Sequence, residues 1–217
     1  MSQADDLVSP LRYSGVSWGV TLGVSFPSAA TLRRVDLSYA NPRLTSSITR
    51  EGSHLQRGHW VELRAPIFHR AADLRSGNLS LFLGGALTAR FSLYEHWYRK
   101  SESERWVNLF GLVEPGGAWH LRLPGGAEVW QEVTVPLAGL VVRPPYHGFT
   151  EVPSPDWEGP GAVKGIHHSL HYWRSVAGGR RGGITYSFQG FRYPDPRPLA
   201  SARHTLRLNV VLWGGPP

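Results

Sequence analysis

The stretch that decides the fold, GGAEVWQEVTVPLAGL, runs from Gly125 to Leu140. It opens with a glycine turn, and from there its residues alternate between two faces. An apolar inner face carries Val129, Gln131, Val133, Val135 and Leu137, and the opposite face carries Trp130, Glu132, Thr134 and Pro136. Alternation with a period of two predicts a β-strand covered on one side. Because proline cannot donate a hydrogen bond to a neighbouring strand, we expect the strand to end at Pro136 and a turn or second short strand to follow.

The same alternation recurs along most of the chain. Its longest example runs from Val16 to Phe26, with large apolar residues on one side and only Ser, Gly and Thr on the other. We expect the apolar sides to face a core, with a hairpin turn at Gly84-Gly85 and a strand end at Pro66. Further strands are predicted at 32–39, 59–65, 79–83, 87–94, 106–113, 119–123, 164–173, 183–191 and 205–213.

Composition agrees with an all-β protein in a single domain. The 217 residues include 25 Gly and 17 Pro, which punctuate short apolar runs, as well as nine Trp. We predict a sandwich of about 9–11 mainly antiparallel strands with little or no helix. Residues 1–15 are expected to form an N-terminal arm, and residues 16–217 one domain with a long Pro-rich loop at 143–162.

Several functional classes are disfavoured. Because cysteine is absent, the chain can form neither a disulfide nor a thiol nucleophile. No run of about 18 apolar residues occurs, so no membrane span is expected, and no secretory signal is recognised at the N-terminus. The formal charge of +7 comes mainly from scattered arginines, which favours a solvated basic surface over specific nucleic-acid binding.

The order of the predicted strands resembles that of a known family. The segments DLRSGNLSLFL, LTARFSLYEHW, VWQEVTVPLAGL, VKGIHHSLHYW and GGITYSFQGF together resemble the galactose-binding-like jelly roll of many carbohydrate-binding modules. The resemblance covers roughly residues 70 to 191, and its most specific part is Trp130 to Leu140. It implies a jelly-roll β-sandwich. Ser187 stands where the family often has an acidic residue, which removes one possible calcium ligand.

The candidate sites favour surface contact over catalysis. His167 and His171 share a face of one predicted strand, but at about 3.3 Å per residue they lie roughly 13 Å apart, too far to share a metal ion. No catalytic, cofactor or metal set is assigned, and we predict a protein that is not an enzyme. Flat aromatic side chains on loops or outward faces are the predicted binding residues; they are Trp97, Tyr98, Trp106, Tyr146, Trp157 and Trp173.

Two functions follow as hypotheses. The first is a structural component of a larger assembly, such as a viral or phage capsid, decoration or tail protein, made in the cytoplasm and located in the virion or on an extracellular surface. Its partners would be other copies of itself or neighbouring structural proteins. The alternative is a carbohydrate-binding module whose exposed aromatics stack on glycans. Trp130 discriminates between scaffold and binding surface: buried, it is scaffold, and exposed beside Trp119 or Tyr146, it belongs to a binding surface.

Overall fold

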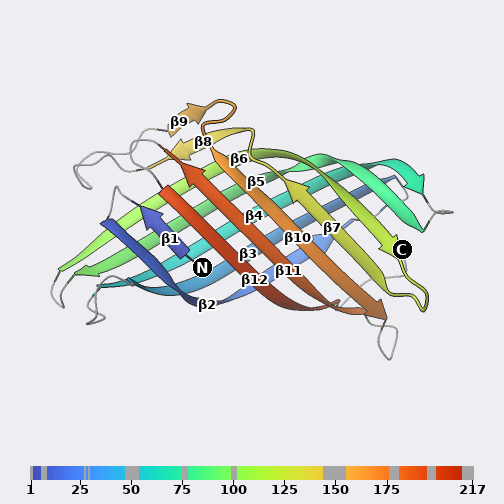
Figure 1. Cartoon of the computed structure of the whole chain (residues 1–217), viewed down its shortest axis with the longest axis horizontal. Helices are drawn as coiled ribbons and strands as arrows, with labels where there is room; N and C mark the ends of the chain where they lie inside the picture. Colours follow the sequence, from blue (N-terminus) through green and yellow to red (C-terminus); the bar gives the residue numbers. More distant parts are fainter. Residues whose placement is uncertain are drawn as a thin grey trace.

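A computed structural model gives the fold, and it describes residues 2–5, 9–26, 28, 30–46, 54–74, 78–98, 102–143, 155–175, 181–194 and 199–211. All the regular structure in these residues is β-strand (Figure 1). The strands are β1 (Ser2–Asp5), β2 (Ser9–Ser25), β3 (Thr31–Ser46), β4 (His54–Leu74), β5 (Leu79–Tyr98), β6 (Glu102–Arg122), β7 (Glu128–Thr134), β8 (Ala138–Val142), β9 (Pro155–Glu158), β10 (Lys164–Ser175), β11 (Arg181–Tyr193) and β12 (Leu199–Val210).

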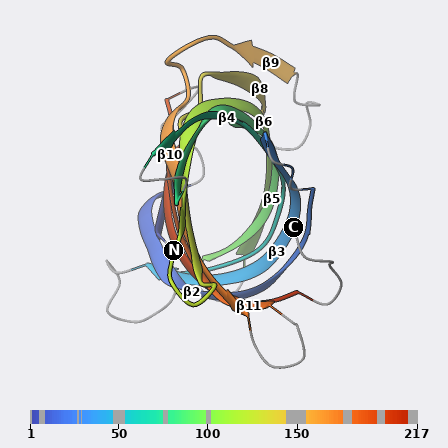
Figure 2. The same ribbon diagram turned by 90° about the vertical axis from the view of Figure 1, so that its right-hand side faces the viewer.

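The strands form one antiparallel sheet that curls round on itself. Its order is β5-β4-β3-β2-β1-β12-β11-β10-β7-β6, and β5 also pairs with β6, which joins the two ends of this series. We call this ring of ten strands the barrel; Figure 2 views it end on. Of the remaining strands, β8 pairs with Leu109–Val113 of β6, next to β7 along the same edge, and β9 pairs with β8. The all-β antiparallel prediction is confirmed, whereas a jelly-roll sandwich is not, because all twelve strands belong to a single sheet.

Several strands are longer than predicted because Gly and Pro do not end them. β5 runs through Gly84-Gly85 without a turn, so the predicted hairpin there is wrong. A Cβ at Gly84 would lie 2.1 Å from the carbonyl oxygen of Ile67, so the glycine permits close approach of β4. β4 likewise continues through Pro66, which is accommodated by an interruption of the β3–β4 ladder between Arg33↔Ile67 and Asp36↔Arg64.

The strand predicted within Gly125 to Leu140 ends before Pro136, as expected. β7 stops at Thr134, two residues before Pro136, and the second short strand is β8. Both pair with β6, and the register between them shifts by one residue, from Gly116↔Thr134 to Val113↔Ala138. The predicted N-terminal arm contributes β1 and the first residues of β2. The predicted loop at 143–162 contains β9, and its residues 144–154 lie outside the described part of the chain.

The orientation of the strands is the reverse of the prediction. In β7 the side chains of Trp130, Glu132 and Thr134 are buried inside the barrel, whereas Val135, directly after the strand and on the other face, is 46% exposed. In β2 the large apolar side chains from Val16 to Phe26 are all exposed. The same inversion applies to the residues predicted to face a core in β5, β11 and β12, which include Leu83, Leu87, Ile184, Leu206 and Leu208. The barrel is therefore apolar on its outer surface.

The barrel interior has three layers. Along β4 the inward residues run Trp60, Glu62, Arg64, Pro66 and Phe68, so charged side chains lie between two aromatic ones. Phe68 packs with Phe82, Ala118 and Trp130 in one apolar cluster. The second cluster consists of Phe110, Leu112, Val141, Val163, Phe191, Tyr193 and Leu199. Trp130 is thus scaffold, which resolves the question raised by its sequence position.

No helix in the described residues has the length and apolar character needed to cross a membrane.

Candidate functional site

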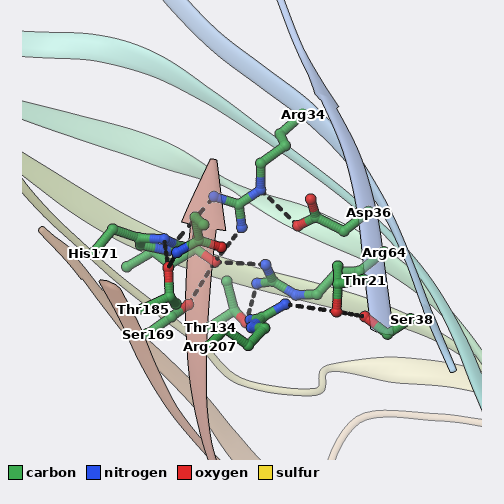
Figure 3. A network of polar contacts seen from close by, with 12 residues as sticks. Thr21, Arg34, Asp36, Ser38, Arg64, Thr134, Ser169, His171, Thr185 and Arg207 are labelled. Atoms are coloured by element: carbon green, nitrogen blue, oxygen red, sulfur yellow. Dashed lines mark hydrogen bonds and ion pairs between the residues drawn. The ribbon is translucent and has the colours of Figure 1, made fainter. Parts of the chain in front are cut away.

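The polar layer of the interior centres on Glu132. Its Oε1 accepts hydrogen bonds from Nη1 of Arg64 at 2.6 Å, from Nη2 of Arg34 at 3.1 Å and from Oγ of Ser169 at 2.8 Å (Figure 3). Burial alone raises the pKa of this carboxyl, but Arg64 and Arg34 outweigh it and hold the pKa well below the ordinary value. Glu132 is therefore a buried carboxylate that joins β3, β4, β7 and β10.

A second buried acid, Glu62, lies in the same layer. Its Oε2 accepts hydrogen bonds from Nε of Arg90 and Nε2 of Gln189, each at 3.1 Å. Burial opposes ionisation of Glu62, but Arg90 and Arg203 lower its pKa to about 2. The third buried acid, Glu114, shifts in the opposite direction. Burial raises its pKa more than Arg64 lowers it, although Nε of Arg64 lies 3.7 Å from Oε2 of Glu114.

Two histidines complete the layer, on one face of β10 as the sequence predicts. His167 and His171 are both buried. Burial lowers the pKa of His171 to about 3, with Arg34 acting in the same direction, and lowers that of His167 well below its usual value. His171 contacts the hydroxyl of Thr185 through Nδ1 at 2.9 Å. Both imidazoles are therefore neutral at physiological pH.

The layer carries more cationic than acidic groups. Five guanidinium groups, those of Arg34, Arg64, Arg90, Arg203 and Arg207, face four carboxyls, those of Asp36, Glu62, Glu114 and Glu132. The Nε atoms of Arg203 and Arg207 are buried without a hydrogen-bond partner in the described structure. Burial lowers the pKa of Arg203 to about 10. The interior thus has an excess of positive charge.

Side chains fill most of the interior space near these groups. A cavity of about 20 Å³ lies beside Arg203, Arg90, Asn108 and Phe110, and it has room for about one water molecule. The ionised side chains beside this cavity are closely packed and buried.

The outer surface has its own polar pattern. Tyr39 and His59 are hydrogen-bonded at 2.8 Å, as are Tyr186 and His204. A third outward pair joins Gln131 and His168, also at 2.8 Å. Each pair links neighbouring strands, so these polar groups on an apolar surface satisfy one another.

The predicted aromatic binding residues are not brought together as one site. Trp157 is 70% exposed on β9, and Trp173 is half-buried on β10. Trp97 and Tyr98 lie at the end of β5 and Trp106 near the start of β6, but their side chains lie outside the described structure, as does Tyr146 altogether. Glycan binding by these residues stays a prediction.

The interior charges were missed by the sequence analysis, although a signal for them exists. Glu62, Arg64 and Arg90 alternate with apolar residues inside long strands, where a solvated sandwich face would equally place charge. No group of three or more His, Cys, Asp or Glu suited to a metal ion occurs among the described residues. A scan of protein-family models, a search of curated proteins and a search of solved structures each found no match to this chain.

Proposed function

We propose that this chain is an integral membrane protein whose barrel strands span a lipid bilayer. The observation that carries the proposal is the inverted pattern of the barrel, with ionised groups inside and large apolar side chains outside. Only helices and closed antiparallel sheets satisfy all backbone hydrogen bonds within a bilayer. A strand that crosses in this way alternates apolar residues toward lipid with polar residues toward the interior, and that is the alternation of β2 and β3.

The length of the apolar surface supports the proposal. On β2 the outward residues from Val16 to Phe26 are all apolar, which covers ten residue steps, or about 34 Å along the strand. At the usual strand tilt of about 45° this spans about 24 Å, close to the apolar band of about 25 Å in membrane barrels. On β3 the outward run Val35, Leu37 and Tyr39 is bounded by exposed Arg33 on one side and by exposed Asn41 and Arg43 on the other, as expected where a strand leaves lipid.

The outward hydrogen-bonded pairs also support the membrane proposal. A lone histidine or glutamine facing lipid would lose its hydrogen bonds to water at a cost of several kcal/mol. Gln131 and His168 instead bond to each other, as do Tyr39 and His59. Such pairing has less value on a surface in water, where solvent supplies the partners.

The packed interior favours a role as a membrane anchor or binding scaffold over that of an open pore. The ion pairs of Glu132 with Arg64 and Arg34 and the hydrogen bond from Gln189 to Glu62 cross the interior, and aromatic clusters lie on either side of them. Passage of a solute would require several of these buried ion pairs to separate.

A virion component is the second candidate, because an apolar surface can also be covered by neighbouring proteins. Exposed large apolar side chains occur on β2, β3, β4, β5, β6, β10, β11 and β12. These apolar side chains surround the barrel, and lipid can cover such a surface on all sides. A protein interface buries only a selected patch, so their distribution favours the membrane proposal over the virion component.

Flotation of the refolded chain with phosphatidylcholine liposomes on a density gradient tests the proposal. We expect the protein to float, to remain bound after carbonate extraction at high pH, and to leave the liposomes impermeable to small sugars. Sugar-induced liposome swelling would contradict the closed interior. A protein that pellets and assembles into regular particles without lipid would overturn the membrane proposal and favour the virion component.

A further inference from the structure

The cavity beside Arg203 lies where the charged layer of the barrel interior meets the second apolar cluster. Its polar lining consists of two arginines, Arg90 and Arg203, and of amide and hydroxyl side chains that include Asn108, Ser92 and Ser201. The apolar lining belongs largely to the second cluster. None of the described residues that line the cavity is acidic. The cavity therefore combines positive charge with neutral hydrogen-bond donors and lacks a carboxylate.

Arg203 is an interior cation without a carboxylate partner of its own. No ion pair joins it to an acidic residue in the described part of the chain, and its Nε is buried without a hydrogen-bond partner there. Its guanidinium group lies over Trp60, 3.5 Å from the centre of the ring. Glu62 attracts Arg203, but Glu62 forms its ion pair with Nη2 of Arg90, at 3.1 Å. Because a charge inside a protein is unfavourable unless it is paired, a counter-ion at Arg203 stabilises the fold.

Asn108 supplies a neutral donor to the same cavity. Its Oδ1 accepts a hydrogen bond from Nε of Arg143 at 3.2 Å, so the NH2 group of the amide is left to donate. Asn108 and Ser92 are both buried, as is Arg143. The lining thus brings a guanidinium group from β12 and amide and hydroxyl groups from β6 and β5 to one small space. This combination of a positive charge with neutral donors is suited to a small anion.

We propose that this cavity binds one monovalent halide ion, with chloride as the physiological candidate, in contact with Arg203 and Asn108. The cavity volume of about 20 Å³ admits an ion slightly larger than water and excludes a larger anion such as gluconate. A water molecule fits the same volume but leaves the positive charge uncompensated, because a pKa of about 10 keeps Arg203 protonated at neutral pH. The halide supplies the counter-charge that no carboxylate among the described lining residues provides.

The bound halide has a structural role. It links β12, which carries Arg203, to β6, which carries Asn108, much as Glu132 links β3 and β4 to β7. Because β12 and β6 are not neighbours in the sheet, the halide adds a connection across the interior. The inference goes beyond membrane residence and does not depend on it, since the cavity lies inside the barrel. Failure of liposome flotation would leave the halide site untouched, and absence of a halide effect on stability would leave the membrane proposal untouched.

Unfolding in chloride and in gluconate tests the site. Urea unfolding of the protein in detergent micelles is measured at constant ionic strength while sodium chloride replaces sodium gluconate. Because a ligand that binds only the folded protein stabilises it by mass action, the unfolding equilibrium constant should fall about tenfold for each tenfold rise in chloride above its dissociation constant. Bromide should act in the same way. Equal stability in chloride and gluconate at all concentrations would overturn the site.

Two arginine variants locate the effect. Arg203→Gln removes the interior cation and should abolish the chloride dependence, whereas Arg43→Gln removes the same charge from the exposed face of β3 and should preserve it. Equal chloride dependence in the two variants would assign the effect to other groups and overturn the site. Should Arg203→Gln fail to fold, crystals of the parent protein grown in sodium bromide decide the question. An anomalous bromide peak in contact with Arg203 and Asn108 is expected, and its absence from the cavity would overturn the proposal.

Discussion

Glu132 and Arg64 are 68 residues apart in the chain and form a 2.6 Å ion pair inside the barrel, where the carboxylate is fully buried. The pair joins β7 to β4, which are not neighbours in the sheet. It therefore ties two strands that are separated by β5 and β6, and Arg34 from β3 adds a second cation to the same oxygen.

Replacing Glu132 by Gln should strongly destabilise the fold. The variant leaves Arg64 and Arg34 buried without their shared counter-charge, and breaking a buried pair in this way costs about 3–5 kcal/mol. Urea unfolding in detergent micelles, followed by tryptophan fluorescence, measures the loss. Asp156→Asn, at an exposed position on β9, is the matched control and should change stability by less than about 0.5 kcal/mol. Equal stability of the two variants would show that the ion pair contributes little.

Two arginine substitutions on the outward face of β3 should distinguish a position that faces lipid from a position that faces water. Leu37 lies midway along the outward apolar run, whereas Thr45 lies beyond Arg43. In a bilayer, arginine costs about 2–4 kcal/mol at the midplane and about 0–1 kcal/mol near the interface. Leu37→Arg should therefore reduce the folded fraction in liposomes much more than Thr45→Arg does. Equal effects of the two variants would argue against a membrane position for this face.

Stability should fall on acidification because of His171. Its pKa in the folded protein is lowered to about 3, chiefly by burial and also by Arg34, whereas the unfolded side chain has its ordinary value of 6.5. Between pH 6.5 and 3 the unfolded chain binds a proton that the folded protein does not, so stability decreases as pH falls. Unfolding free energies at pH 7 and pH 5 measure this.

The variant His171→Gln isolates this histidine, since glutamine keeps hydrogen-bonding capacity near Thr185 without titrating. The variant should lose less stability than the parent protein between pH 7 and pH 5. The carboxyl of Glu62, with a pKa of about 2, contributes its own loss only at lower pH. An unchanged pH dependence in the variant would assign the effect to other groups.

Gln131 and His168 should contribute to the stability of the protein in liposomes as a hydrogen-bonded pair rather than singly. His168→Leu alone leaves Gln131 unpaired on the apolar surface, and Gln131→Leu leaves the histidine unpaired. Because replacing both partners avoids the unsatisfied group, the double variant should be at least as stable in liposomes as either single variant. A double-mutant cycle measures this coupling, and additive effects of the two changes would show that the hydrogen bond contributes nothing there.

The positions of several strands follow from the sequence, but which face of each strand points into the barrel does not. Alternation from Val16 to Phe26 and from Val129 to Thr134 predicts strands, and Pro136 predicts the end of one of them. Yet a period of two is the same whether the apolar side faces a core or the outside, so Trp130 and Glu132 were assigned to the wrong side of the wall. A contrary signal was present in the residues opposite the apolar ones, which are small in β2 and include the charged Glu132 in β7.

The interior network could not be predicted for a different reason. Arg34 and Glu132 are separated by 98 residues, and their contact depends on closure of the sheet between β5 and β6. Closure in turn depends on strands that continue through Gly84 and Pro66, where local rules favour a turn or an end. His167 and His171 were correctly placed on one face, because that relationship requires only the strand itself.

The most direct test of the inverted barrel is a cysteine scan of β2 from Val16 to Ser25 in liposomes, with one spin label at each position. The account predicts that labels at Val16, Trp18, Val20, Leu22 and Val24 are accessible to oxygen dissolved in lipid and shielded from a water-soluble nickel reagent. Labels at the intervening inward positions should show low oxygen accessibility, giving a period of two. Labels at the apolar positions that are accessible to the nickel reagent, or that are buried from both reagents, would contradict it.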